Sequence, residues 1–576
     1  MDQRISRRRA LQWSSLIIAG ISLSACSPAS TEEAENTTKD QPLTFRFANA
    51  ALAPSLDTAL SGTLETARIS AQVLEPLVRA NINTGEPEAS LATDWSISDD
   101  GLTYRFFLES SVKFQDGTDF NAAAVIKNYQ RWLKVAQNTA SNSHVDYLQL
   151  FSALNSQDGT SALVTGCKEE EGAVVFTLSR PSSSFLKALT QPAFGIGSPK
   201  AFNDKLEFTK FPVGTGAYTV TDWNGKRVQL DYFTNYRGEK PSVERIIFTA
   251  IPDAEKRFVA IMNDEIDAYD LVSSQNYVDL AREGTITQPR DPYSICYLTF
   301  NLRHKLLSKR EIRSAIAHAV ERNQLVKKNF PQGTNVADDF LPSLFMMKNK
   351  DTAAYYSTQK DITRDRLKEA GYKNEPLEFY YPTGVSLPWM MSPETIFASI
   401  SADLVKAGIN IKPVPVAWDE GYLDTINKSS DTRAIALTGF VGSYRDPNAF
   451  LSRVLAPNLE FLSQVKETKT VAPDAEEEKN PDLAPQDSSS TEDSSQEDEN
   501  VVSYREILAA IRKADQLTEL NNRREAYSSI NLKVAQLMPA FPLCYPVSSV
   551  ALGPRVSYYP LSATAISEMV GANVNP

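Results

Sequence analysis

Apolar and polar residues alternate along parts of the chain with the period of a β-strand. Phe45 and Phe47 alternate with polar neighbours, and residues 103–108 form a β-favouring aromatic run, so both segments are predicted to be strands. Two further β-favouring runs within residues 218–232 flank Asn224-Gly225. This pattern predicts a hairpin closed by a type I′ turn, in which both central residues have positive φ.

Between the predicted strands, apolar residues recur with helical spacing. Ile312, Ile316 and Val320 lie on one face of a predicted helix. Residues 362–370 are predicted to form another helix, because Gly371 follows them as a terminating residue.

A longer helix is predicted from its end signals. Ser392 is expected to act as the N-cap, Pro393 occupies the first turn, and Gly408 ends the helix before a strand over residues 409–416. The alternation of strands and helices along the chain predicts an α/β protein.

Composition narrows the class of protein further. The chain has 576 residues, of which 42% are hydrophobic, so two to four domains of ordinary size are expected. Four cysteines, none at Cys-x-x-Cys spacing, exclude a disulfide-dense scaffold and the usual zinc motifs. The three histidines leave little scope for imidazole chemistry.

The net charge of −12 is concentrated in one segment. Residues 466–500 hold twelve acidic and three basic side chains, so the rest of the chain is nearly neutral. This segment has almost no large apolar residues and is predicted to be a disordered surface insertion. A calcium-binding or partner-binding role for the acidic strip is the alternative. Composition does not indicate a nucleic-acid partner.

The N-terminal residues have the pattern of an export signal. Arginines precede an apolar stretch, and residues 23–26, Leu-Ser-Ala-Cys, resemble the lipobox of bacterial lipoproteins, which implies that Cys26 receives the lipid. Residues 1–25 are then a signal peptide and residues 26–41 a lipidated tether. An ordinary secretory signal with a chance cysteine is the alternative, and the arginines at 7–9 leave Sec and Tat export both open. Of Cys167, Cys296 and Cys544, two at most can pair.

Enzyme signatures are not found. The sequence has no histidine pair four residues apart, no Gly-x-Ser-x-Gly segment and no complete phosphate-binding or dinucleotide fingerprint at Gly214-Thr215-Gly216. His318 lies on the predicted helix at 312–320 and is interpreted as a structural or surface histidine. No catalytic residue, metal ligand or cofactor is therefore predicted.

An ordered series of motifs resembles one known family. Residues 75–77, 91–104 and 112–118 are similar to the signature region of the family 5 solute-binding proteins, the dipeptide- and oligopeptide-binding components of ABC importers. Further similar segments follow in order at residues 212–218, 235–236, 263–267, 312–316, 368–372 and 439–447. The resemblance spans residues 43–556.

The resemblance implies an α/β, class C (type II) periplasmic-binding-protein fold with two lobes and an extra subdomain in the first lobe. The implied parts are lobe I at 42–70, its extra subdomain at 71–204, a second part of lobe I at 205–293, lobe II at 294–545 with the insertion at 466–500, and a return to lobe I at 546–576. The ligand is expected in the cleft between the lobes.

Matching positions in the family imply the ligand-binding residues, which are Trp418, Gly439, Phe440, Ser443, Tyr147 and Tyr545. Gly439 would let a ligand backbone approach closely, and Phe440 stands where relatives usually carry tryptophan. Core packing is the alternative role for each aromatic residue. Ser443 stands where peptide-binding relatives carry an aspartate that pairs with the ligand's α-ammonium group, which puts recognition of a free N-terminus in doubt.

The resulting hypothesis is a lipid-anchored, non-catalytic receptor on the extracytoplasmic face of a bacterial membrane. It would act as a monomer, bind a peptide or peptide-like solute, and deliver it to an ABC permease and ATPase complex. The alternatives are the same fold with a glycan, an opine or a chelated metal as cargo, and a transport-inactive lipoprotein that regulates envelope assembly. An enzyme is the least supported reading.

Overall fold

The computed structural model describes residues 41–137, 147, 150, 151, 162–428, 430–458, 499–564 and 566–576. The predicted signal peptide, Cys26, nearly all of the tether and nearly all of the acidic insertion lie outside the described residues. Residues 42–576 form one compact unit. Within the described part of the chain, no helix is both long enough and apolar enough to span a bilayer.

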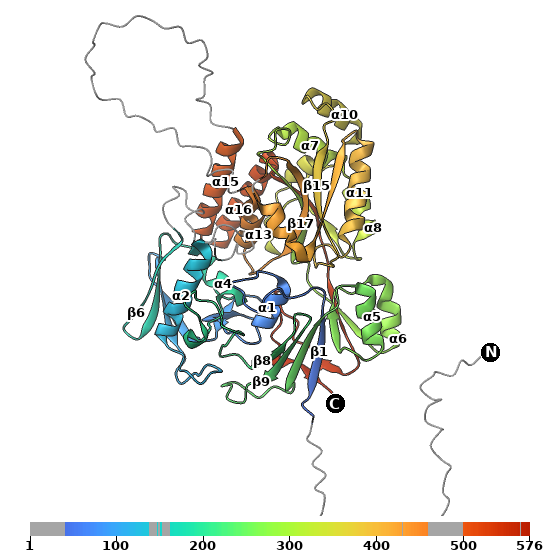
Figure 1. Ribbon diagram of the computed structural model, residues 1–576. Coiled ribbons are helices and arrows are strands. Elements are labelled where there is room, and N and C mark those ends of the chain that lie inside the picture. Colours follow the sequence, from blue (N-terminus) through green and yellow to red (C-terminus); the bar gives the residue numbers. More distant parts are fainter. Residues whose placement is uncertain are drawn as a thin grey trace, which may run out of the picture. The chain divides into compact units, whose positions relative to one another are not determined.

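Two large sheets organise this unit (Figure 1). The first has seven strands in the order β12-β19-β11-β1-β10-β9-β8. Its central strand β1 pairs in parallel with β10 and β11, whereas the outer pairs are antiparallel. The strands are β1 (Thr44–Asn49), β8 (Tyr218–Trp223), β9 (Arg227–Tyr232), β10 (Arg245–Ala250), β11 (Ala268–Asp270), β12 (Ile286–Pro289) and β19 (Ser549–Leu552). Helices α1 (Leu64–Ser70), α5 (Ala254–Met262) and α6 (Tyr277–Arg282) accompany this sheet.

The second sheet has six strands in the order β14-β18-β13-β17-β15-β16. Strands β13 and β17 are buried along nearly their whole length because helices cover both faces, which explains their continuous apolar sequences. The strands are β13 (Ser294–Phe300), β14 (Asn335–Val336), β15 (Leu377–Thr383), β16 (Ile411–Ala417), β17 (Arg433–Val441) and β18 (Ala540–Tyr545). The main helices are α7 (Arg310–Ala319), α8 (Arg322–Asn329), α10 (Lys360–Glu369), α11 (Pro393–Lys406), α12 (Tyr422–Asn427), α13 (Pro447–Leu455), α15 (Glu499–Asp515) and α16 (Leu520–Leu537).

A smaller antiparallel sheet, in the order β4-β5-β7-β6, packs with the helix α2 (Ala122–Gln137). Its strands are β4 (Ala92–Ile97), β5 (Thr103–Leu108), β6 (Val164–Glu170) and β7 (Ala173–Leu178). Below, lobe I means the part built on the seven- and four-stranded sheets, and lobe II the part built on the six-stranded sheet. The residue boundaries predicted for the lobes and for the extra subdomain remain predictions.

Two short segments join the lobes. Residues 290–293 run from β12 to β13, and residues 546–548 run back from β18 to β19. The segments are hydrogen-bonded to each other, since the Arg290 N–H donates to the Ser548 carbonyl at 2.9 Å and the Ser294 hydroxyl donates to the Pro546 carbonyl at 3.1 Å. Paired extended segments of this kind are where two lobes can rotate about a common axis.

The predicted strands at Phe45 and Phe47 and at residues 103–108 are confirmed as β1 and β5. The hairpin β8–β9 is also confirmed, but its turn is not type I′, because only Gly225 has positive φ. The Asn224 side chain accepts the N–H groups of Lys226 and Arg227 at 3.1 and 2.9 Å. The Asn224 side chain thus satisfies these two backbone N–H groups of the turn, and positive φ at Asn224 is not needed.

The predicted helices are confirmed as α7, α10 and α11, and the glycines that end α10 and α11 have positive φ. The predicted side-chain cap at Ser392 was wrong, because its hydroxyl makes no capping hydrogen bond. Pro393 nevertheless occupies the first turn, where its missing N–H costs nothing. The strand predicted at 409–416 forms as β16, which begins two residues later and ends one residue later than predicted.

The three described cysteines are free thiols. Cys296 on β13 and Cys544 on β18 are fully buried and lie opposite each other in the antiparallel ladder. Cys167 is half-buried on β6 in the four-stranded sheet. The structure therefore brings only the first two together.

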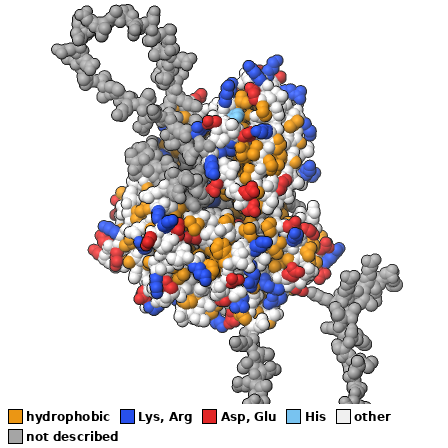
Figure 2. Space-filling view, in the orientation of Figure 1, with side chains coloured by type: hydrophobic (Ala, Val, Ile, Leu, Met, Phe, Trp, Pro, Cys, Tyr) orange, Lys and Arg blue, Asp and Glu red, His pale blue; other side chains and the backbone are white. Residues whose placement is uncertain are grey.

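Charged residues are mixed over the surface. On the face shown in Figure 2, acidic and basic side chains of the described residues are interspersed and form no single-sign stripe. This agrees with the near-neutral charge of the chain outside the acidic segment.

Helix α13 begins at a fully buried carboxylate. Asp446 caps the helix by accepting the Asn448 N–H at 3.0 Å, and Pro447 occupies the first turn. The same carboxylate pairs with Arg523 from α16, whose Nη2 lies 2.9 and 3.1 Å from the two carboxylate oxygens. Removing Asp446 takes away the closer partner of the buried Arg523, whose Nη2 otherwise has only the more distant Asp515 carboxylate at 3.9 Å among its ion-pair partners.

We therefore predict that Asp446→Asn lowers the free energy of unfolding by about 3 to 5 kcal/mol. Asparagine still caps a helix, so the loss comes from the charge. Asp253→Asn is the matched control, because Asp253 caps α5 at an exposed position and should cost about 0.5 kcal/mol or less. Urea unfolding of both variants measures the difference, and equal losses would contradict the role given to the ion pair.

Candidate ligand-binding site

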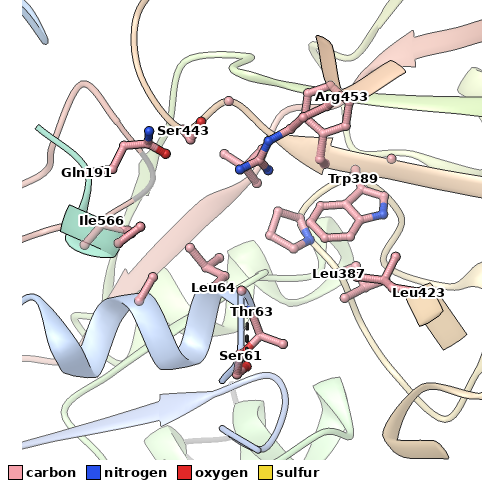
Figure 3. A pocket seen from close by; sticks show the side chains of 18 of the residues that line it. Ser61, Thr63, Leu64, Gln191, Leu387, Trp389, Leu423, Ser443, Arg453 and Ile566 are labelled. Atoms are coloured by element: carbon pink, nitrogen blue, oxygen red, sulfur yellow. Dashed lines mark hydrogen bonds between the residues drawn. The ribbon is translucent and has the colours of Figure 1, made fainter. Parts of the chain in front are cut away.

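A cavity lies between the two lobes (Figure 3). About 210 Å³ of it can be reached by the centre of a water molecule. Lobe I contributes the start of α1 and its preceding loop, residues 190–193, Thr564 and Ile566. Lobe II contributes residues 387–389, Trp418, the end of β17 with the residues after it, and Arg453. A ligand held there touches both lobes at once.

The start of α1 forms one wall of the cavity. Thr63 is the N-cap, and its hydroxyl accepts the Thr66 N–H at 3.4 Å. The Ser61 and Thr63 hydroxyls lie 3.2 Å apart, and Figure 3 shows Leu64 beside them at the cavity. The capping contacts thus fix the turn that brings the Leu64 side chain to the cavity.

Aromatic side chains form the opposite wall. The rings of Trp389 and Trp418 lie 6.3 Å apart at 60°, and Trp418 also stacks on Tyr422 at 6.2 Å. Phe440 meets Tyr297 edge to face at 6.1 Å. These arrangements are favourable for aromatic pairs and leave broad apolar surfaces toward the cavity.

Five of the six predicted ligand-binding residues line this one cavity: Trp418, Gly439, Phe440, Ser443 and Tyr147. They come from three separate parts of the sequence, and the fold brings them together. Whether they contact a ligand remains a prediction.

Gly439 has a packing role that the sequence did not indicate. A Cβ atom at this position would lie 2.3 Å from the Ile295 carbonyl oxygen and 2.4 Å from Cδ1 of Trp389. No real Cβ contact is that short, so a side chain here would displace Trp389 or the neighbouring strand. The glycine is required by the protein's own packing, whereas the prediction attributed it to approach of the ligand.

Tyr147 lies at the edge of the cavity and is almost fully buried. Its hydroxyl donates to the Ala193 carbonyl at 2.6 Å, and its ring meets Phe194 edge to face at 5.4 Å. These contacts support residues 190–193, which also line the cavity. Tyr147 therefore holds a wall segment in place.

Tyr545 is not among the residues that line the cavity. It is the last residue of β18, and its hydroxyl donates within lobe II to Asp339, 2.5 Å from Oδ1 and 2.7 Å from the carbonyl oxygen. The predicted position near the return to lobe I is observed, but the side chain turns into the core. Burial raises the pKa of Asp339 to about 6, and the hydrogen bond from Tyr545 opposes this rise.

Most of the residues that line the cavity were not predicted from the sequence, among them Trp389, Glu65 and Arg453. Trp389 stands in a loop without a motif, and Glu65 and Arg453 lie on helices whose orientation the sequence does not reveal. For Arg453 a weak signal existed, because the Asp446-Pro447 helix start follows directly after the predicted ligand-facing segment. Among the described residues, no group of three or more metal-binding side chains could hold an ion.

The chain belongs to the bacterial extracellular solute-binding proteins, family 5, because the sequence model described as "Bacterial extracellular solute-binding proteins, family 5 Middle" matches residues 86–459. This confirms the resemblance seen in the motifs. The family is one of binding proteins rather than enzymes.

Curated relatives and solved structures agree with this assignment. The chain is 26% identical to the dipeptide-binding protein of Escherichia coli K12, over 78% of this chain and 84% of the relative. It is 24% identical to heme-binding protein A of Haemophilus influenzae, over 98% of both chains. The structure of the periplasmic binding protein DppA of Helicobacter pylori with the peptide STSA matches with a TM-score of 0.75 and 21% identity, covering 92% of this chain and 98% of that one. The type II periplasmic-binding fold is thereby confirmed.

The burial of the Asp339 carboxyl predicts a pH-dependent contribution to stability. A folded pKa of about 6 lies above the value of about 3.9 in an unfolded chain, so the folded state binds more protons between these values. The contribution of Asp339 to stability should therefore fall as pH rises from about 4 to about 6, by about 2 to 3 kcal/mol, and then level off.

Asp339→Asn should remove this contribution, which urea unfolding at pH 4, 5, 6 and 7 would show as a flatter profile than that of the wild type. Asp338→Asn is the control, because this neighbouring carboxylate is partly exposed and pairs with Lys348 at 2.6 Å. The control should keep most of the wild-type slope. Identical slopes for the wild type and Asp339→Asn would refute the assignment.

Proposed function

We propose that this chain is the lipid-anchored substrate-binding protein of an ABC importer. It binds a peptide or peptide-like solute between its lobes, without altering it chemically, and delivers it to the permease. The lipid on Cys26 holds the protein at the extracytoplasmic face of the membrane. The tether that follows this residue separates the lobes from the bilayer.

The observation that carries this proposal is a cavity whose walls come from both lobes, between which the described chain passes at residues 290–293 and 546–548. Hydrogen bonds also join the lobes, among them one from the Ser182 hydroxyl to Asp515 at 2.6 Å and one from the Asn448 amide to the Ser184 hydroxyl at 3.2 Å. Loss of these bonds lets the lobes rotate about the two chain segments, which changes the distance between the walls and so admits, encloses or releases a solute. Enclosure also alters the outer surface that a permease would contact. Family membership supports the same role.

The similar proteins favour a peptide as the solute, because they include a dipeptide-binding protein and two proteins whose structures were solved with a bound peptide. A non-peptide solute is the second candidate. Ser443 in the cavity wall carries no negative charge, so it offers no ion pair to a peptide ammonium group. Proteins of the same fold have been solved with agropinic acid and with Ni(L-His)₂.

The aromatic wall predicts the effect of Trp418→Ala. Loss of the indole surface should weaken binding of the solute about 5- to 30-fold, corresponding to about 1 to 2 kcal/mol. Native mass spectrometry of the purified protein identifies a retained solute, equilibrium dialysis against peptide pools finds an exchangeable one, and calorimetry compares the variants. Trp95→Phe, on β4 outside the cavity, is the control and should bind as the wild type does. A protein that neither retains nor binds any solute would refute the proposed function.

The lipid anchor predicts a separate result. Cys26→Ala should abolish incorporation of labelled fatty acid and move the protein from the membrane fraction to the soluble fraction of the producing cells. Cys167→Ala, which changes a half-buried thiol in lobe I, should leave both properties unchanged. Membrane retention of the Cys26→Ala protein would contradict the anchor.

A further inference from the structure

The charges around the cavity are few. Among the described residues that line it, only Glu65 and Arg453 carry formally charged side chains, and they come from opposite lobes. All other lining residues are apolar, aromatic, hydroxyl-bearing, amide-bearing or glycine. The charge of the ligand therefore depends on what these two residues do.

Glu65 belongs to a buried cluster behind α1. Its side chain is almost fully buried, and burial raises its pKa, which disfavours its negative form. The charges that act on it most are Arg68, Asp270 and Arg257, which lie within lobe I rather than across the cavity. Glu65 is thus a poor partner for a positive group on a ligand.

Arg453 points into the cavity from lobe II. Figure 3 shows its guanidinium group between Ser443 and Trp389. Its central carbon lies 5.6 Å from the centre of the Phe440 ring, within range of a cation–π interaction. A guanidinium group has five N–H donors in one plane, so it can donate hydrogen bonds to a ligand as well as to a partner within the protein. Its shape matches a carboxylate, which it can bind through two parallel hydrogen bonds.

The backbone that carries Arg453 is firmly held. Helix α13 is capped by Asp446, which is paired with Arg523, and the helix buries five apolar side chains after its first turn. These are Ala449, Phe450, Leu451, Val454 and Leu455. An arginine on a fixed helix recognises an anion with a smaller loss of conformational entropy than one on a loop.

The surroundings of Arg453 favour an apolar ligand body. Trp389, Trp418 and Phe440 present ring surfaces, and aliphatic side chains complete the walls. These aliphatic residues are Leu64, Leu387, Leu423, Ile426 and Ile566. An anion bound beside such walls must carry apolar or aromatic groups to fill them.

We propose that Arg453 is the anion-binding residue of this cavity, and that the solute bears a carboxylate group on an apolar or aromatic body and is recognised without a free ammonium group. The proposal rests on the proposed function, because it assumes that the cavity is the binding site. It names the chemical class of the solute, which the proposed function leaves open.

Four related probes distinguish recognition of the carboxylate of a small peptide from recognition of its ammonium group. N-acetyl-Leu-Phe has only the carboxylate, Leu-Phe-amide has only the ammonium group, Leu-Phe has both, and N-acetyl-Leu-Phe-amide has neither. Calorimetry on the purified wild-type protein should show similar affinities for the two probes that keep the carboxylate. Removing the carboxylate should weaken binding about 10- to 100-fold, whereas removing the ammonium group should change it less than about 3-fold.

Variants at position 453 test the residue itself. Arg453→Gln should lower the affinity for N-acetyl-Leu-Phe to that of its amide and leave the affinity for the amide unchanged. Arg453→Lys keeps the charge but loses the planar fork, so it should restore part of the affinity. Arg303→Gln is the control, since Arg303 pairs with Asp431 at 3.1 Å on the surface of lobe II and should bind every probe as the wild type does. Thermal unfolding of each variant confirms that it folds.

The outcomes distinguish this proposal from the proposed function. A dependence on the ammonium group instead of the carboxylate, an Arg453→Gln protein that still prefers the carboxylate, or failure of all four probes to bind the wild type would each overturn the role of Arg453. In all three cases the proposed function stands if the protein retains or binds another solute that Trp418→Ala weakens. It falls only if no solute is bound at all.

Discussion

The carboxylate of Asp446 is the contact on which the lobe II side of the cavity depends. It lies in the turn that leads from β17 into α13, caps that helix and pairs with Arg523 of α16. The turn therefore fixes both the end of β17, which lines the cavity, and the direction of the helix that follows. Because Ser443 precedes the turn and Arg453 follows it, the positions of both in the cavity wall are set by one buried ion pair.

A second group of buried charges holds the lobe I side. Arg68 on α1 bonds to Asp270 at the end of β11, and Arg290 reaches the same carboxylate at 3.2 Å. Burying such charges costs desolvation energy, which only close pairing offsets. Arg290 also begins the first connection between the lobes, where its N–H bonds to Ser548. The buried cluster of Arg68, Asp270 and Arg290 therefore contacts both α1, which forms one cavity wall, and the first connection between the lobes.

The cavity between these two anchors takes its walls from both lobes. Its described lining contains no histidine or cysteine, and its aromatic and aliphatic walls offer contact area with few directional groups. If Arg453 binds the anionic group of the solute as we propose, the apolar surface supplies affinity and the one guanidinium group supplies orientation and selectivity.

Local signals in the sequence were sufficient for several strands and helices of the fold. Alternation predicted β1, a β-favouring aromatic run predicted β5, and helical spacing with terminal glycines predicted α10 and α11, because these signals depend on neighbours a few residues apart. The turn of the β8–β9 hairpin and the cap of α11 differed from expectation, because several hydrogen-bond arrangements satisfy the same backbone donors. The ordered motifs indicated the family, and five of six predicted site residues line one cavity.

What the sequence by itself determined was therefore the family, several of the strands and helices, and segments that line the cavity between the lobes. Only the tertiary structure decided which side chains of those segments face the cavity. In the structure, the Tyr545 hydroxyl is hydrogen-bonded to Asp339, Trp389 occupies the space beside Gly439, and Arg453 lies between the lobes. The physical reason is that the orientation of each side chain depends on packing and charge contacts with residues that are far away in the sequence. These contacts exist only once the distant elements have come together in the fold.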